Sequence, residues 1–350
     1  MKIALLTLPY DNNYGGNLQR YALMKVLQDM GHDVTHIFLK SHASLKWYVK
    51  PYSYIKRSIN KLTSKICIPV FYEEKCNKLM EERCKETMLF YDKYINHTEP
   101  CYCIEDVKRV CKDNYDAYIV GSDQVWRASM TGQLGIENYF LKFLNKNNCK
   151  KIAYAASLGN VDPDYSEKQY YRLNKMYKQF FKVSLREEST VEVFKSKGFT
   201  SPEPTFCLDP TLLLNAKDYE DIIESSEVQH KTVSKIFCYV LDDSERIHSV
   251  IDSKKSELGI DAVIETIYCN QPISIEQWLA NIHDADFVIT DSYHGTVFSI
   301  IFNKQFQYVG NEERGNERVS SLLKSIGYGE DDDSKKIKAI NKSIEFLRNI

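Results

Sequence analysis

Residues 285–301 (ADFVITDSYHGTVFSII) combine a buried strand, a polar turn and a histidine. The pattern predicts a strand over Phe287–Thr290, a turn over 291–295 and an apolar helix that begins near Thr296. In open α/β folds, ligands bind where a strand ends in such a turn. A helix start offers unpaired backbone N–H groups and a positive dipole end, which suit an anion. His294 can add a proton or a positive charge, so the segment predicts an anionic substrate beside His294.

A second glycine-containing turn follows the first predicted strand, residues 3–8. A helix over 17–30 comes next, Gly31 ends it, and residues 32–37 form another strand, which completes a βαβ unit. Gly15 and Gly16 at the helix start have two interpretations: they permit positive φ in a tight turn, or they let a sugar approach the backbone. In the second interpretation the surrounding side chains would hydrogen-bond the sugar: Asn12, Asn13, Tyr14 and Asn17.

Strand and helix patterns alternate along the rest of the chain, which predicts an α/β fold with mainly parallel sheets. The polar stretch 217–235 suggests a boundary, so we expect a first domain over 1–215 and a second over 216–330. Residues 331–350 would form an acidic linker and a C-terminal helix that crosses back to the first domain.

Composition narrows the class of protein. A length of 350 residues allows two domains with real cores, and a net charge of -2 argues against a nucleic-acid partner. The 10 cysteines include no C-x-x-C pair, which favours reduced core thiols in a cytoplasmic protein over a metal site. We expect neither a signal peptide nor a membrane span, because the sequence has no signal-peptide pattern and no sufficiently long apolar run.

Five motifs together carry a resemblance to a known family, the polysaccharide pyruvyl transferases. They occur in this order: NYGGNLQ (13–19), GSDQVW (121–126), SLRE (184–187), LDPT (208–211) and TDSYHGT (290–296), and the resemblance as a whole spans residues 3 to about 326. The resemblance implies two facing Rossmann-like domains, similar to the GT-B glycosyltransferase architecture. It also implies transfer of the pyruvyl group of phosphoenolpyruvate onto a sugar, as a ketal on two hydroxyls.

The resemblance also implies roles for particular residues. His294 falls on the family's histidine near phosphoenolpyruvate, and Arg186 on an arginine that binds the anion. Ser292 stands where several members carry arginine, so Arg314 or Arg318 would supply the missing charge. Planar guanidinium groups suit carboxylate and phosphate, and the helix start at Gly295 and Thr296 would add backbone donors.

Ketal formation needs a proton on the enol carbon, a base for the acceptor hydroxyl and neutralisation of the leaving phosphate. His294 is expected to bind phosphate first and to act as an acid second. Asp123 is the candidate base, with Asp291 as its substitute. Ser122 and Trp126 complete the predicted acceptor site. Neither a cofactor nor a metal is expected, because no ligand cluster has a recognisable spacing.

Several of these residues also have structural interpretations. Asp123 would cap a helix, and Trp126 would belong to a core or an interface. Arg186 would form a surface ion pair with Glu187 or Glu188. The Asp209–Pro210 pair would be a structural turn rather than a site.

Residues 40–65 hold seven basic residues, no acidic one and interleaved aromatic residues. One interpretation is a solvated face with packed tyrosines. The other is a peripheral contact with an anionic inner membrane leaflet, where lipid-linked oligosaccharides are built.

The sequence thus predicts a pyruvyl transferase that acts on a sugar, free or lipid-linked, of a surface or capsular polysaccharide precursor. Two alternatives remain at this point: a glycosyltransferase that uses a nucleotide sugar, and a non-catalytic sugar-binding relative.

Overall fold

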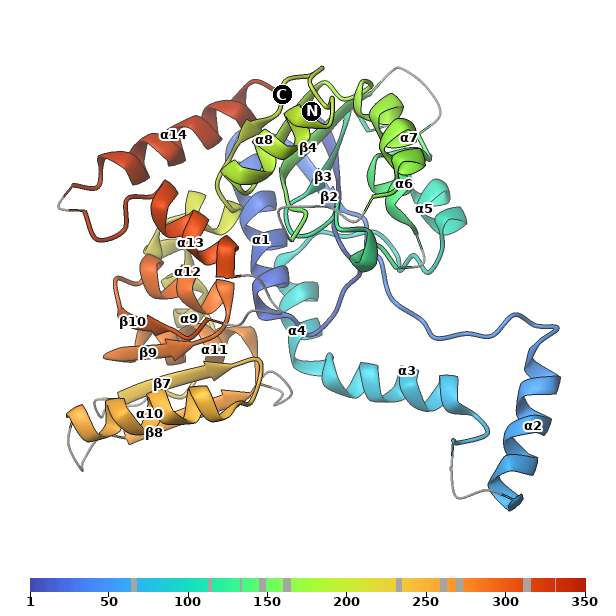
Figure 1. The fold of residues 1–350 in the computed structure, drawn as a ribbon, viewed down its shortest axis with the longest axis horizontal. Coiled ribbons are helices and arrows are strands. Elements are labelled where there is room, and N and C mark those ends of the chain that lie inside the picture. Colours follow the sequence, from blue (N-terminus) through green and yellow to red (C-terminus); the bar gives the residue numbers. More distant parts are fainter. Residues whose placement is uncertain are drawn as a thin grey trace.

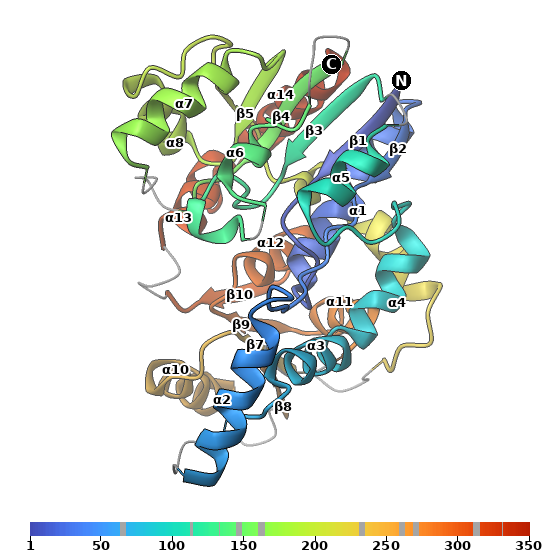
Figure 2. The ribbon, with the colours of Figure 1, turned by 90° about the vertical axis from the view of Figure 1, so that its right-hand side faces the viewer.

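The computed structural model describes most of the chain. The described residues are 1–63, 68–112, 115–132, 134–144, 149–159, 165–230, 235–258, 263–268, 273–310, 316–330 and 332–350. They form an α/β structure with two parallel sheets, as predicted (Figures 1 and 2).

The first sheet has six parallel strands in the order β2-β1-β3-β4-β5-β6. Alternate residues of each strand face opposite sides, so Ile3 and Leu5 enter one core whereas Ala4 and Leu6 enter another. Both faces are therefore covered, which explains why these strands are near-continuous apolar runs. The strands are β1 (Lys2–Leu6), β2 (Asp33–His36), β3 (Ala117–Gly121), β4 (Lys150–Ala156), β5 (Lys182–Leu185) and β6 (Thr205–Phe206).

Helices join and cover these strands. They are α1 (Tyr14–Asp29), α4 (Lys85–Tyr94), α5 (Ile104–Val110), α6 (Ile136–Tyr139), α7 (Glu167–Tyr177) and α8 (Glu188–Ser196), with short 3-10 turns η1 (Ala128–Met130) and η2 (Pro210–Leu213). Helix α9 (Ala216–Glu224) follows the last strand and contacts α11 of the second half.

The second sheet has four parallel strands in the order β10-β9-β7-β8. The strands are β7 (Lys235–Val240), β8 (Val263–Tyr268), β9 (Phe287–Thr290) and β10 (Gln305–Tyr308). Their helices are α10 (Glu245–Leu258), α11 (Ile275–His283), α12 (Tyr293–Ile301) and α13 (Asn316–Ser325).

The last helix, α14 (Ser334–Arg348), returns to the first sheet, as predicted (Figure 1). The Ser343 hydroxyl accepts a hydrogen bond of 2.9 Å from the Leu208 N–H. Phe346 packs on Tyr154, with their ring centroids 6.0 Å apart. Leu347 is fully buried.

Two helices start earlier than the sequence predicts. Helix α1 begins at Tyr14 rather than near residue 17, because the Asn13 side chain caps it by accepting from the Gly16 N–H. Helix α12 begins at Tyr293 rather than near Thr296, because Ser292 caps it in the same way. Gly15 and Gly16 are therefore helical and lack positive φ, so the tight-turn interpretation is wrong.

The start of α1 packs against the second half of the molecule. The ring centroid of Tyr14 lies 5.8 Å from that of Tyr239 and 5.6 Å from that of Trp278. The Tyr14 hydroxyl accepts a hydrogen bond of 3.2 Å from the Ile273 N–H. Aromatic pairs at this separation stabilise a contact beyond their buried area, so the turn before α1 is held against the second sheet.

Helices α2 (Lys50–Thr63) and α3 (Tyr72–Arg83) leave the body of the molecule (Figure 1). We call residues 46–63 and 71–83 together the arm. No helix among the described residues is long and apolar enough to cross a membrane.

Candidate functional site

A cavity of about 240 Å³ lies between the two sheets, at the carboxyl ends of their strands. This is where parallel α/β sheets bind ligands. Its walls come from the loop before α1, the loop after β3, the end of α3, the ends of β7, β9 and β10, and the starts of α12 and α13. We call it the cleft, and its lining is Asp11, Asn12, Asn13, Arg83, Asp123, Gln124, Tyr239, Leu241, Asp291, Ser292, Tyr293, His294, Tyr308, Arg318 and Val319.

His294 lies on the first turn of α12, and its side chain is only 11% exposed. Its imidazole packs directly on Gly15 of α1, so closely that a methyl group at that position would overlap the ring. Its Nε2 lies 3.7 Å from Asp209 Oδ2, beyond hydrogen-bond distance. The histidine thus lines the cleft where the two halves meet, with its Nδ1 against Gly15 and its Nε2 towards the Asp209 carboxylate.

Asp209 is the centre of a buried polar cluster behind His294. One carboxylate oxygen accepts from Arg186 Nη1 at 3.2 Å and from the Gln19 amide, and the other accepts from the Thr211 hydroxyl at 2.7 Å. Burial raises the pKa of Asp209, but His294, Arg186 and Thr211 together outweigh it and hold that pKa well below its usual range. Asp209 is therefore ionised and supplies a fixed negative charge to the histidine.

Arg186 belongs to the same cluster rather than to the surface. Burial opposes its charge, yet the nearby Glu187, Tyr293 and Asp209 raise its pKa, so it is a buried cation. Its Nε donates to Glu187 at 3.2 Å, and its Cζ lies 4.8 Å from the centre of the Tyr293 ring. Glu187 also accepts from Ser157 at 2.7 Å. The surface-pair interpretation is wrong, and Arg186 stands behind Tyr293 instead of lining the cleft.

Arg318 is the cation of the second half that lines the cleft. It is half-buried on α13, and its Cζ lies 5.9 Å from the Tyr293 ring, on which Arg186 also packs. Burial and the neighbouring Arg186 lower the pKa of Arg318, because both disfavour its charge. An anion beside Arg318 would relieve this. Arg314, the alternative candidate, lies outside the described residues.

Of the remaining residues predicted to bind the anion, one lines the cleft, and the donor groups of the others are already used in hydrogen bonds. Ser292 lines the cleft and caps α12. The Gly295 N–H already donates to Ser292, and the Thr296 hydroxyl is buried and donates to the Ser292 carbonyl at 3.1 Å. The donors that remain at this helix start are the backbone N–H groups of Tyr293 and His294, which precede the first helical hydrogen bond.

The two candidate bases differ in their surroundings. Asp123 lines the cleft in a left-handed backbone conformation, with φ of 68°, and no helix begins there, so the capping interpretation is wrong. Asp291 accepts from the backbone N–H groups of Leu241 and Asp242 at 2.7 and 2.9 Å. Burial raises the pKa of Asp291 against those bonds. Asp291 therefore joins β9 to the end of β7, and Asp123 is the better-placed carboxylate.

The predicted acceptor residues are only partly brought together. Asn12 and Asn13 line the cleft, whereas Asn17 is buried and donates to the backbone of Asp11 and Asn13. Ser122 is buried and accepts from Gln19 at 3.2 Å.

The expectation that Trp126 contacts a sugar is wrong. Its ring is fully buried and stacks between Phe140 and Phe194, at 4.6 and 5.4 Å between centroids. The core interpretation of Trp126 is the correct one.

Four residues of the cluster and several that line the cleft were not predictable as site residues from the sequence. Asp209 was interpreted as a turn, and it does hold the Thr211 N–H at 3.1 Å, but it also carries the charge behind His294. The other cluster residues not predicted are Gln19, Glu187 and Tyr293, and the further cleft residues not predicted are Asp11, Arg83, Gln124, Tyr239, Leu241, Tyr308 and Val319. Gln19, Glu187 and Asp209 stand inside the quoted motifs, and a polar residue within an apolar stretch was the available signal.

Replacing Gly15 with alanine should displace His294, because the added methyl group overlaps its imidazole. Gly16 is the matched control on the same helix: a methyl group there meets no atom nearer than 3.6 Å. Alanine in a helix normally stabilises by about 1 kcal/mol over glycine. We therefore expect Gly16→Ala to raise the unfolding midpoint and Gly15→Ala to lower it, measured by thermal denaturation. Equal midpoints in the two variants would contradict the packing described here.

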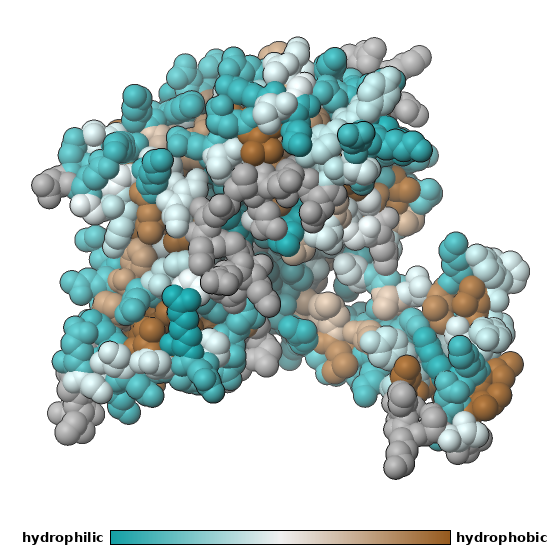
Figure 3. Space-filling model, in the orientation of Figure 1, coloured by the Kyte–Doolittle hydropathy of each residue, from teal (hydrophilic) through white to brown (hydrophobic). Residues whose placement is uncertain are grey.

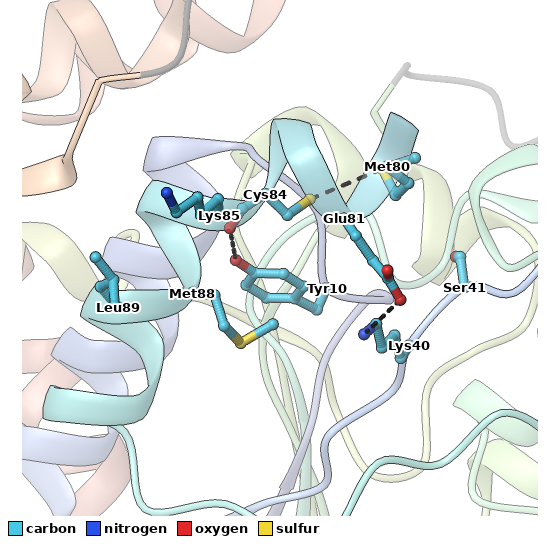
Figure 4. Close-up of a pocket in the computed structure, with 9 residues that line it drawn as sticks. All are labelled: Tyr10, Lys40, Ser41, Met80, Glu81, Cys84, Lys85, Met88 and Leu89. Carbon is cyan, nitrogen blue, oxygen red and sulfur yellow. Dashed lines mark hydrogen bonds and ion pairs between the residues drawn. The ribbon is translucent and has the colours of Figure 1, made fainter. Parts of the chain in front are cut away.

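A second, more apolar cavity of about 300 Å³ lies beside the cleft (Figure 4). Residues that are neighbours in the sequence line the two cavities. Tyr10 and Cys84 line this one, whereas Asp11 and Arg83 line the cleft. The Tyr10 hydroxyl donates to the Cys84 carbonyl at 3.1 Å, and Lys40 and Glu81 form an ion pair of 3.8 Å at its rim. We call it the side pocket; its other lining residues are Ser41, Met80, Lys85, Met88 and Leu89.

Comparison with known proteins gives a family and a fold. The model of the family described as polysaccharide pyruvyl transferase matches residues 13–313. No functionally curated protein matches the chain. Among solved structures, the UDP-GlcNAc 2-epimerase of Methanocaldococcus jannaschii is similar with a TM-score of 0.52 and 10% identity, over 100% of this chain and 93% of that one. A putative UDP-N-acetylglucosamine 2-epimerase of Listeria monocytogenes has a TM-score of 0.52 and 8% identity, over 99% and 90%. At such identities the likeness shows the fold alone, the two-domain GT-B-like arrangement.

Proposed function

Because the chain belongs to the polysaccharide pyruvyl transferase family, we propose that it transfers the pyruvyl group of phosphoenolpyruvate onto a sugar as a ketal. The observation that carries the proposal is that His294, the cation Arg318 and the carboxylate of Asp123 all line the same cleft. Anion binding, proton donation and proton acceptance are the three tasks that this reaction requires.

The donor fits the wall formed by α12 and α13. Phosphoenolpyruvate carries a phosphate and a carboxylate, which a guanidinium binds in a planar, bidentate way. Arg318, the N–H groups at the start of α12 and the imidazole of His294 would hold these two groups. Arg186 acts as a positioning residue in this proposal, because it holds Asp209 and Tyr293 rather than facing the cleft.

The proposed reaction balances without a redox step. The methylene carbon of the enol gains a proton and becomes a methyl group, with His294 as the acid. One sugar hydroxyl then attacks the adjacent carbon, the bond from that carbon to the phosphate oxygen breaks, and a second hydroxyl closes the ring. Of the two protons lost by the hydroxyls, one replaces the proton given to carbon and the other leaves with the phosphate. Asp123, which lines the cleft, would accept the first of them.

The acceptor fits the opposite wall. Asn12 and Asn13 line it beside Asp123, and amide side chains both donate to and accept from sugar hydroxyls. We propose a sugar of a surface or capsular polysaccharide precursor, in the cytoplasm, with the lipid-linked form of that precursor at the inner face of the membrane.

Binding of phosphoenolpyruvate should raise the unfolding midpoint, because a ligand of the folded state stabilises it by mass action. The gain reaches about 2.7 kcal/mol at a hundredfold excess over Kd. Arg318→Met should remove most of the shift, whereas Arg172→Met, an exposed arginine on α7, should keep it. Release of inorganic phosphate with a sugar acceptor, and a ketal methyl signal by NMR, would then identify the reaction. No shift with phosphoenolpyruvate in the unmodified protein would overturn the donor assignment.

A nucleotide-sugar glycosyltransferase is the second candidate, favoured by the fold shared with the two epimerase structures. Stabilisation by UDP-GlcNAc or UDP, and none by phosphoenolpyruvate, would select it. Sugar binding without release of phosphate would select a non-catalytic relative.

A further inference from the structure

The arm exposes more large apolar side chains than its length requires. Trp47 is 82% exposed, Tyr52 67%, Ile55 61% and Ile59 54%, and Tyr48 is also exposed. We call these five residues the apolar stripe. Helix α2, which carries three of them, lies at the far right of Figure 1, and hydrophobic surface is visible on the arm in Figure 3. Contiguous exposed apolar surface of this kind marks an interaction site.

The stripe is not the face that holds α2 in place. Residues 52, 55 and 59 of α2 follow one another at spacings of three and four, so they share one side of the helix, and Trp47 and Tyr48 lie in the turn that precedes it. The contacts with the next helix come from another side: Tyr54 packs 5.2 Å from Phe71, and Arg57 binds Glu73 with two hydrogen bonds of 2.7 Å. These contacts fix the helix and leave the stripe turned away from them.

Cations surround the stripe. Lys46, Lys50, Lys56 and Lys61 are exposed, and residues 40–63 contain no acidic residue. Two of the lysines lie over stripe aromatics, Lys46 at 5.9 Å from the Tyr48 ring and Lys56 at 5.9 Å from the Tyr52 ring. Apolar and aromatic side chains bordered by lysines are the pattern of a helix that lies in the interface of an anionic bilayer.

We propose that the apolar stripe docks on the surface of an anionic lipid bilayer. A second copy of this chain fits less well, because a symmetric contact would bring the same lysine-rich faces together. Vesicle binding does not require the pyruvyl reaction, so this inference goes beyond the proposed function.

The position of the arm gives the docking a consequence for the cleft. Arg83, the last residue of α3, lines the cleft, and Met80 and Cys84 line the side pocket next to it. The inner end of the arm therefore forms part of the walls of both the cleft and the side pocket (Figure 4). A docked arm would hold the cleft beside the bilayer on which a lipid-linked acceptor stands.

Tryptophan fluorescence offers a selective test with the full chain. The protein has three tryptophans, and Trp126 and Trp278 are fully buried, so a blue shift on adding vesicles reports Trp47. We expect the shift, and co-sedimentation, with vesicles of equal parts phosphatidylglycerol and phosphatidylcholine. Vesicles of pure phosphatidylcholine should bind the protein at least about tenfold more weakly. Binding to the anionic vesicles should weaken by a similar factor when the salt concentration rises from about 0.1 M to about 1 M.

Two sets of variants separate the apolar and the charged contributions. Tyr52→Ser/Ile55→Ser/Ile59→Ser should abolish sedimentation, whereas Tyr171→Ser/Phe181→Ser, exposed aromatics elsewhere, should not. Lys50→Glu/Lys56→Glu/Lys61→Glu should weaken binding about tenfold or more, and Lys168→Glu/Lys175→Glu/Lys178→Glu on and beside α7 should change it far less.

The proposal is overturned if the unmodified protein ignores phosphatidylglycerol vesicles at low salt, or if the serine variant binds like the unmodified protein. A dimer in solution that the serine variant converts to a monomer would assign the stripe to a second copy instead. Stabilisation by phosphoenolpyruvate should be the same in all these variants, so failure of docking and failure of the donor assignment are distinguishable.

Discussion

Replacing His294 with alanine should reduce pyruvyl transfer by about 10²–10⁴-fold while the protein stays folded. In the proposed reaction the imidazole gives the proton to the enol carbon; the ring lines the cleft and packs on Gly15 of α1. The buried Nε2 of the ring makes no hydrogen bond, so the alanine variant breaks none, but the space left beside Gly15 should lower the unfolding midpoint. Initial rates at saturating phosphoenolpyruvate, with thermal denaturation as the folding check, measure both effects.

His248→Ala is the matched control, since this histidine is exposed on α10, outside the lining of the cleft. The pattern of kinetic constants distinguishes the two roles proposed for His294. Loss of phosphate binding alone would raise KM and leave kcat, whereas loss of the acid would lower kcat. Asparagine at this position keeps a donor but cannot transfer a proton, so His294→Asn should recover KM and not kcat. A variant that retains more than about a tenth of kcat would contradict the acid role.

The fold was largely predictable because it depends on patterns that are local in the sequence. Apolar runs such as 117–120 and 287–290 became strands at the expected positions, and repeated βα units can form only parallel sheets with covered faces. The starts of α1 and α12 were misplaced because a capping side chain extends a helix across glycines that favour a turn. Asn13 and Ser292 were visible, but the helix start was placed at the apolar pattern that follows them.

Site residues were predictable only where they come shortly after the end of a predicted strand. His294 and Asp123 come directly after β9 and β3, so topology alone brings them to the cleft. Arg186 also follows a strand, β5, but its side chain forms ion pairs with two carboxylates. One is the adjacent Glu187 and the other is Asp209, which is distant in sequence. No local pattern shows that Asp209 lies beside Gln19, 190 residues away, since their contact depends on how α1 packs on η2. Trp126 was misjudged for the same reason, because its stacking partners belong to α8 and to the segment after α6.

Replacing Asp209 with alanine should lower the free energy of unfolding by about 3–5 kcal/mol, the usual cost of removing one partner from a buried ion pair. Asp209 is fully buried, and its loss leaves the Arg186 cation with Glu187 alone. Gln19 and the Thr211 N–H also lose their acceptor. Urea denaturation at pH 7 measures the difference. Asp221→Ala is the control, because that carboxylate forms an exposed pair with Lys217 on α9 and should contribute little.

The same carboxylate should give stability a dependence on pH. The pKa of Asp209 is held below its unfolded value of about 3.9, so the folded state binds fewer protons than the unfolded state as that value is approached. Its contribution is therefore complete above about pH 5 and is lost as the pH falls through 4 and below. Asp209→Asn keeps the shape of the side chain but cannot titrate, so its unfolding free energy should fall less steeply between about pH 5 and pH 3 than that of the unmodified protein. Parallel curves over this interval would mean that Asp209 is not the buried charge that orients His294, and the cluster would then have to hold Arg186 through Glu187 alone.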